Sequence, residues 1–148
     1  MPPVTRRSTL ALLFALPLAA CGAGRDKTPQ GPEAINRLVT KYARIYDMPE
    51  SLIHETIARE SGYNPAARNG PYYGLMQIHP QTARTMGYRG DPAGLLDAET
   101  NLIYAGKYLR GAWLVSGRNE DRAMMWYAKG YYYEAKRKGL LEETGLRS

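Results

Sequence analysis

A glutamate stands on the apolar stripe of a predicted helix, where its carboxyl group could carry out proton-transfer chemistry. Glu60 is the last residue of this helix, which is expected over 49–60, and it lies nearly two full turns beyond the first member of the stripe. A carboxyl group in such a place is partly desolvated, which favours the neutral form that a general acid needs. A helix-end glutamate paired with the adjacent Arg59 is the alternative, and periodicity alone favours neither interpretation. The stripe is formed by Ile53, Thr56 and Ile57.

A series of short motifs begins at this glutamate. The motifs are ESGYNP (60–65), GLMQ (74–77), PQTA (80–83), DAETNLIYAGKYL (97–109) and WYAKG (126–130). In that order and spacing they resemble the lytic transglycosylase (SLT) family, whose lysozyme-like fold is related to that of goose-type lysozyme. Several matches in the correct order are far more specific than any single match of four residues. The resemblance covers roughly 45–130, which is most of the part expected to fold.

The resemblance implies cleavage of the β-1,4 bond between N-acetylmuramic acid and N-acetylglucosamine in peptidoglycan. Glu60 would protonate the glycosidic oxygen and then act as base on the C6 hydroxyl of the muramic acid. That hydroxyl closes onto C1, which leaves a 1,6-anhydro end without consuming water. Ordinary glycoside hydrolysis places two carboxylates across the bond. The other acids considered, Asp47, Asp91, Asp97 and Glu99, are better explained as helix caps or surface residues, so one catalytic carboxylate is expected.

The resemblance also assigns roles to residues around Glu60. Ser61 would orient the glutamate, and Tyr127 would reach it from the fifth helix. Structural interpretations remain open beside these roles, because Leu75, Met76 and Tyr127 could be ordinary core residues and Gly74 only a turn residue. The residues expected to contact substrate are Ser61, Tyr63, Tyr73, Gly74, Leu75, Met76, Gln77 and Tyr127.

Two departures from the family pattern fall in this region. Ala128 replaces the asparagine that follows the tyrosine in the family, which removes a polar contact near the catalytic acid. Pro71, Tyr72 and Tyr73 replace small residues before Gly-Leu-Met-Gln, where bulk could narrow the cleft or add a face for sugar stacking. Two alternatives therefore stay open: a weakly active or inactive peptidoglycan-binding or scaffolding lipoprotein, and a lysozyme-type hydrolase.

The elements that position these residues read as helices separated by glycine and proline. The fold expected is mostly α, of the α+β lysozyme-like kind, with about five to six helices and a small hairpin or loop beside the cleft. The loop covers 61–80, with a possible hairpin around 72–78. Helices are predicted over 33–46, 49–60, from 80 until Gly87 ends it, from Asp97 or Thr100 to 116, from 119 through 127, and over 131–138.

The first 20 residues have the layout of an export signal. Arg6 and Arg7 precede an apolar run from 10 to 20 that is too short to span a membrane. The run ends in Leu-Ala-Ala-Cys-Gly, which resembles a bacterial lipobox with Cys21 as the lipid-bearing residue. We therefore expect a signal peptide over 1–20, a lipidated flexible tether over 21–32 and the lytic transglycosylase domain over 33–148.

Composition limits the partners. One cysteine, Cys21, excludes an internal disulfide and a cysteine-based metal cluster. His54-Glu55 begins like a zinc-protease helix, but Ala58 stands where the second histidine would be, so neither a metal nor a cofactor is expected. The net charge of +6, which becomes +4 without residues 1–20, favours anionic partners. The expected partners are peptidoglycan and, through Cys21, a membrane.

Three further expectations concern the state of the chain. The consecutive tyrosines 131–133 point in different directions on a helix, so a nucleic-acid platform is not expected there. The protein is expected to be monomeric. It is placed in the periplasm, anchored by lipid, with the outer membrane preferred over the inner because Gly22 is not the aspartate associated with inner-membrane retention.

Overall fold

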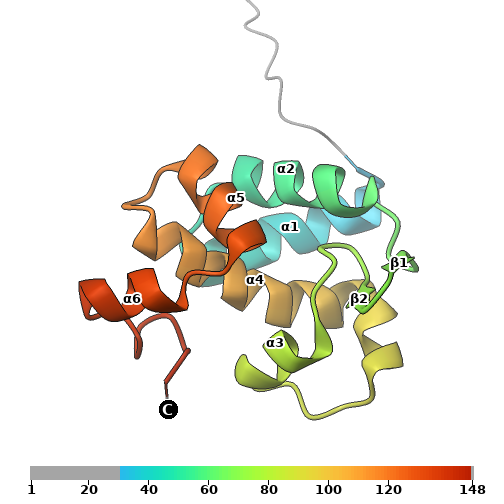
Figure 1. The fold of residues 1–148 in the computed structure, drawn as a ribbon. Coiled ribbons are helices and arrows are strands. Elements are labelled where there is room, and N and C mark those ends of the chain that lie inside the picture. Colours follow the sequence, from blue (N-terminus) through green and yellow to red (C-terminus); the bar gives the residue numbers. More distant parts are fainter. Residues whose placement is uncertain (1–30, 148) are drawn as a thin grey trace, which may run out of the picture.

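A computed structural model of the chain describes residues 31–147, and helices dominate it. Figure 1 shows α4 passing through the middle of the domain, with α1, α2 and α5 on one side and α3 on the other. The expected mostly α architecture is confirmed. The elements are α1 (Glu33–Tyr46), α2 (Glu50–Ser61), β1 (Arg68–Asn69), β2 (Tyr72–Tyr73), α3 (Pro80–Thr85), the 3-10 helix η1 (Pro92–Leu96), α4 (Ala98–Val115), α5 (Glu120–Lys129) and α6 (Tyr132–Lys138).

The central helix α4 is buried along most of its length because α1, α3, α5, α6 and η1 all contact it. Small residues on its surface let neighbouring side chains approach closely. The ring of Tyr46 lies over Gly106, and the ring of Tyr131 lies over Gly111, where any Cβ atom would clash. Each ring is fixed by its hydroxyl, which donates to a backbone carbonyl of α4, Ile103 for Tyr46 and Tyr108 for Tyr131.

Helix starts follow the capping residues predicted from the sequence. The Asp97 side chain accepts a hydrogen bond of 2.8 Å from the backbone N–H of Thr100 at the start of α4. This bond holds the pKa of Asp97 below its usual range. Asn119 caps α5 in the same way, through the backbone N–H of Arg122 at 2.9 Å. Both capped helices contribute to the site described below.

The segment between α2 and α4 differs from expectation in two places. The hairpin was expected around 72–78, but its strands are β1 and β2, and Tyr73 forms only a single bridge with Ile78 beyond them. The pairing moves toward the N-terminus because Gly70 and Pro71, with φ of +58° at the glycine, form the turn between the strands. Residues 92–96 form η1, which periodicity does not reveal in so short an element.

Within residues 31–147, no helix is long and apolar enough to cross a membrane. The predicted signal peptide, the lipid-bearing Cys21 and most of the predicted tether lie outside the described residues.

Buried tyrosines should make the fold less stable at alkaline pH. Burial raises the pKa of Tyr127 and Tyr131 well above the ordinary value of about 10. Above pH 10 the unfolded chain releases these protons while the folded chain keeps them, so stability falls as pH rises. We expect the unfolding free energy to drop by about 1.4 kcal/mol per pH unit for each buried tyrosine. Urea denaturation at pH 9, 10 and 11 measures it, and an unchanged free energy would contradict this reading.

Candidate active site

Two adjoining cavities form a groove beside the C-terminal end of α2. One has a volume of about 330 Å³ and the other about 480 Å³, and they share the lining residues Tyr72, Gln77, Tyr127 and Ala128. The smaller cavity contains Glu60, whose side chain is 24% exposed. Glu60 is the sole acid among the residues of 31–147 that line either cavity. The groove therefore presents one partly buried carboxyl group and no partner carboxylate across from it.

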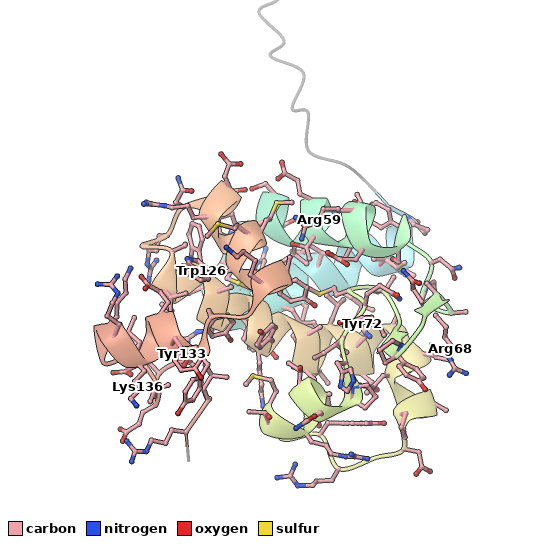
Figure 2. All side chains as sticks on the ribbon, in the orientation of Figure 1. Arg59, Arg68, Tyr72, Trp126, Tyr133 and Lys136 are labelled. Carbon is pink, nitrogen blue, oxygen red and sulfur yellow. The ribbon has the colours of Figure 1, made fainter. Side chains whose placement is uncertain are left out.

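The alternative interpretation of Glu60, a pairing with Arg59, is also present in the structure. The guanidinium donates to Glu60 Oε1 through Nε at 3.1 Å and through one terminal nitrogen at 2.9 Å. The same terminal nitrogen lies 3.5 Å from the backbone carbonyl of Met124 on α5. Figure 2 shows Arg59 near the place where α2 and α5 approach each other. The glutamate is thus both a groove residue and one member of an ion pair, and the two interpretations do not exclude each other.

The loop over 73–77 is held against the core by one buried amide. Asn101 of α4 is fully buried, and its Oδ1 accepts the backbone N–H of Met76 at 2.9 Å. Its Nδ2 donates to the carbonyls of Tyr73 and Leu95, each at 2.8 Å. These three bonds use both N–H groups of the amide and one of the two acceptor sites of its oxygen. Asn101 therefore joins the loop, η1 and α4, and it sets the position of the residue that follows Met76.

Gly74 is required by the same arrangement. Its φ is +77°, and a Cβ atom there would lie 2.3 Å from Asn101 Nδ2 and 2.3 Å from the carbonyl oxygen of Leu95. Both the backbone conformation and the close packing exclude a side chain. Gly74 is therefore a turn residue that lets the loop pack closely against Asn101 and Leu95.

Gln77 of the loop and Tyr127 of α5 line both cavities and carry polar side-chain atoms. Gln77 adopts φ +48°, and its Nε2 donates to the carbonyls of Ala67 and Gly74 at 3.1 and 2.8 Å. Its Oε1 is buried and has no hydrogen-bond partner within the described residues. The Tyr127 hydroxyl donates to the Met76 carbonyl at 2.7 Å. Gln77 is held by its N–H groups, so its oxygen remains available as an acceptor.

Tyr72 forms the exposed wall of the groove. It lines both cavities, its side chain belongs to the exposed large residues of the domain, and its ring meets that of His79 edge-on with centroids 5.9 Å apart. Tyr73 points elsewhere, because its hydroxyl accepts from Arg68, whose guanidinium lies over the ring. Of the two tyrosines before Gly74, Tyr72 is therefore the one whose ring faces the groove.

The structure brings only part of the predicted set to the groove. Glu60, Gln77 and Tyr127 line it, whereas Tyr73, Gly74, Leu75 and Met76 lie behind it as supports. Leu75 and Met76 are fully buried in the core. Other residues line the groove although the sequence did not predict them there. They include Asn69, His79, Gln81, Thr85, Lys129 and Leu146.

Ser61 and Tyr63 have other partners in this structure. The Ser61 hydroxyl donates to the carbonyl of Ile57, one turn earlier, at 3.3 Å. The Tyr63 hydroxyl lies 3.0 Å from Nδ1 of the buried His54, and burial lowers the pKa of that histidine. Tyr63 does not line either cavity. Among residues 31–147, no three His, Cys, Asp or Glu side chains gather as a metal site.

Comparisons with known proteins identify the family. The family model "Transglycosylase SLT domain" matches residues 37–140. The chain is similar to the soluble lytic murein transglycosylase of Salmonella typhimurium (strain LT2), with 35% identity over 107 residues. That match covers 67% of this chain and 16% of the relative, so the chain spans a small part of that protein. No solved structure matches the chain. Because this family model matches more than half of the chain, the chain belongs to the transglycosylase SLT domain family.

Proposed function

We propose that this protein is a peptidoglycan lytic transglycosylase, which cleaves the bond between N-acetylmuramic acid and N-acetylglucosamine and leaves 1,6-anhydro ends. The observation that carries the proposal is the single acid of the groove. Most inverting and retaining glycosidases use a second carboxylate within about 10 Å of the first. Intramolecular attack by the C6 hydroxyl needs only one group, which gives a proton and later accepts one.

In this mechanism Glu60 transfers the protons and Tyr127 has a structural role. Glu60 protonates the glycosidic oxygen as the bond to C1 breaks. The resulting carboxylate then takes the proton of the C6 hydroxyl as its oxygen closes onto C1, so Glu60 ends in its starting state. Tyr127 takes no proton in this scheme, because burial raises its pKa and its hydroxyl donates to Met76. Its role is to hold the 73–77 loop against α5.

Gln77 and Tyr72 are the residues that we assign to sugar binding. Gln77 lines the groove, and its buried Oε1, which has no partner within residues 31–147, would accept a hydrogen bond from a sugar N–H or O–H group. The face of Tyr72 would stack on the apolar face of a sugar ring. Ala128 lines both cavities and adds no polar side-chain group to them.

Digestion of purified peptidoglycan by the full chain, kept in mild detergent, tests the proposal. Mass spectrometry of the released fragments is expected to show muropeptides with 1,6-anhydro ends. Fragments with reducing ends would instead support a lysozyme-type hydrolase. Binding to peptidoglycan without any products would support a scaffolding role. Two observations favour the scaffolding role: Arg59 forms an ion pair with Glu60, and Ala128 supplies no polar contact.

We expect Tyr72→Ala to raise KM for glycan strands about five- to tenfold, because a stacked aromatic contact contributes about 1 kcal/mol or slightly more. The maximal rate should change little, since Tyr72 does not contact Glu60. Steady-state release of anhydro ends measures both constants. Tyr133→Ala is the matched control, because Tyr133 is 84% exposed and lies outside the groove. An equal effect of the two substitutions would contradict the stacking role.

The localisation is proposed from the sequence and the substrate together. Peptidoglycan lies in the periplasm, and the lipobox-like segment would tether the domain over 33–148 to a membrane through Cys21 and residues 21–32. The outer membrane is preferred, and the domain is expected to act as a monomer. We expect Cys21→Ala to move the protein from the membrane fraction to the soluble fraction, as measured by fractionation and immunoblotting. Unchanged partitioning of this variant would contradict the anchor.

A further inference from the structure

The contact between Arg59 and Glu60 is an unusual one for adjacent helical residues. Side chains at i and i+1 point in different directions on a helix and do not normally face each other. Here the guanidinium turns along the helix end so that two of its nitrogens reach the same oxygen, Glu60 Oε1. Its contact with the Met124 carbonyl fixes it from the side of α5. The Arg59 side chain is 40% exposed, so a ligand in the groove can reach it.

This ion pair conflicts with the role of Glu60 as an acid. Glu60 Oε1 accepts two hydrogen bonds from the guanidinium, so this oxygen is not available to the glycosidic oxygen while the ion pair is intact. The conflict disappears when another carboxylate takes the guanidinium. No residue of the described part offers one, because Glu60 is the only acid that lines either cavity. The groove does contain a second cation, Lys129, which forms no ion pair within residues 31–147.

The substrate can supply the missing carboxylate. The sugar rings of peptidoglycan are neutral, and its free carboxylates lie on the peptide stems or, where a stem is absent, on the lactyl group of muramic acid. Arginine binds carboxylates through two parallel hydrogen bonds, which a lysine cannot reproduce. A groove with two cations and one acid is thus complementary to a glycan strand that carries carboxylates.

We propose that Arg59 exchanges partners when substrate binds: it leaves Glu60 and holds a carboxylate of the substrate, which makes it a specificity-determining residue. This inference rests on the proposed function for its consequence in catalysis. The exchange links recognition to chemistry, because Glu60 Oε1 is released for the glycosidic oxygen only on strands that occupy Arg59. Strands without carboxylates leave the ion pair in place and are cleaved slowly.

Binding to variants without the catalytic acid tests the exchange directly. In the Glu60→Gln variant Arg59 has no carboxylate to hold, so it is free for the ligand. Three soluble strands are compared, all with acetylated amines: peptide-bearing strands, the same strands with their carboxylates converted to methylamides, and strands stripped of peptides by an amidase. Calorimetry gives the dissociation constants.

We expect the Glu60→Gln variant to bind a carboxylate-bearing strand about tenfold more tightly than the methylamide strand. Adding Arg59→Gln should reduce this ratio to about one, and Arg59→Lys should leave an intermediate ratio, because one charge remains without the paired donors. Arg122→Gln is the matched control for net charge, since Arg122 lies outside the groove. Tight binding of peptide-bearing strands alone identifies the stem as the source, and tight binding of stripped strands identifies the lactyl group.

A ratio that is the same with and without Arg59 overturns the inference. A wild-type protein that releases no anhydro ends from any strand overturns the proposed function, while the binding ratios still decide the exchange. With active enzyme, kcat/KM should be about tenfold higher for the carboxylate-bearing strand than for the methylamide strand, and Arg59→Gln should remove that difference.

Discussion

Glu60→Gln should abolish the release of anhydro ends, with a loss of at least about 1,000-fold in kcat. The expected loss is large because the same group acts twice, first as acid and then as base, and the amide can do neither. The groove holds no other acid that could substitute for it. Single-turnover assays on purified glycan strands, with products identified by mass spectrometry, measure the rate.

The same substitution should leave the fold intact. Within residues 31–147 the Glu60 side chain bonds to Arg59 alone, and partly exposed ion pairs contribute about 1 kcal/mol at most. Glu55→Gln is the matched control, because it makes the same change on the same helix outside the groove. A Glu60→Gln variant that keeps more than about a tenth of wild-type activity would exclude Glu60 as the general acid.

Asn101→Ala should produce the largest loss of stability, about 3–5 kcal/mol. The substitution leaves three backbone groups of the core without their partner: the N–H of Met76 and the carbonyls of Tyr73 and Leu95. Each unsatisfied buried group costs about 1–3 kcal/mol. Urea denaturation gives the free energy. Catalysis should fall as well, even well below the melting temperature, because the loop that carries Gln77 is no longer fixed.

Asn119→Ala provides the comparison for that experiment. It removes the cap of α5, a single exposed hydrogen bond, and should cost about 1 kcal/mol with little effect on activity. If Asn101→Ala cost no more than Asn119→Ala, the loop would not depend on the buried amide, and its role in positioning Gln77 would have to be abandoned.

Much of the helical part of the fold could be predicted from the sequence. The bounds of α1 match the prediction, and Asp97 and Asn119 cap the helices that they were expected to begin. These features are local, because apolar periodicity and capping depend on neighbouring residues. The hairpin register and η1 could not be predicted with the same precision. Short elements have too few residues for a period, and their pairing depends on contacts with Asn101 and α4.

The candidate site was predictable to the extent that it lies in motifs. Glu60, Gln77 and Tyr127 all line the groove, as the matched segments suggested. The sequence could not separate residues that face the groove from those that support it, because Gly74, Leu75 and Met76 belong to the same short run as Gln77. Leu146 reaches the groove from the C-terminal segment by tertiary packing alone. Arg59 was visible as a neighbour of Glu60, but its double contact with one oxygen depends on α5 as well.

The central claim is that one carboxylate cleaves the glycan without water, and digestion in oxygen-18 water tests it most directly. Peptidoglycan is treated with the full chain in labelled water, and the new ends are examined by mass spectrometry. We predict anhydro ends that are lighter than reducing ends by one water and carry no label. New reducing ends with labelled oxygen at C1 would show that water is the nucleophile, and would contradict the mechanism built on Glu60 alone.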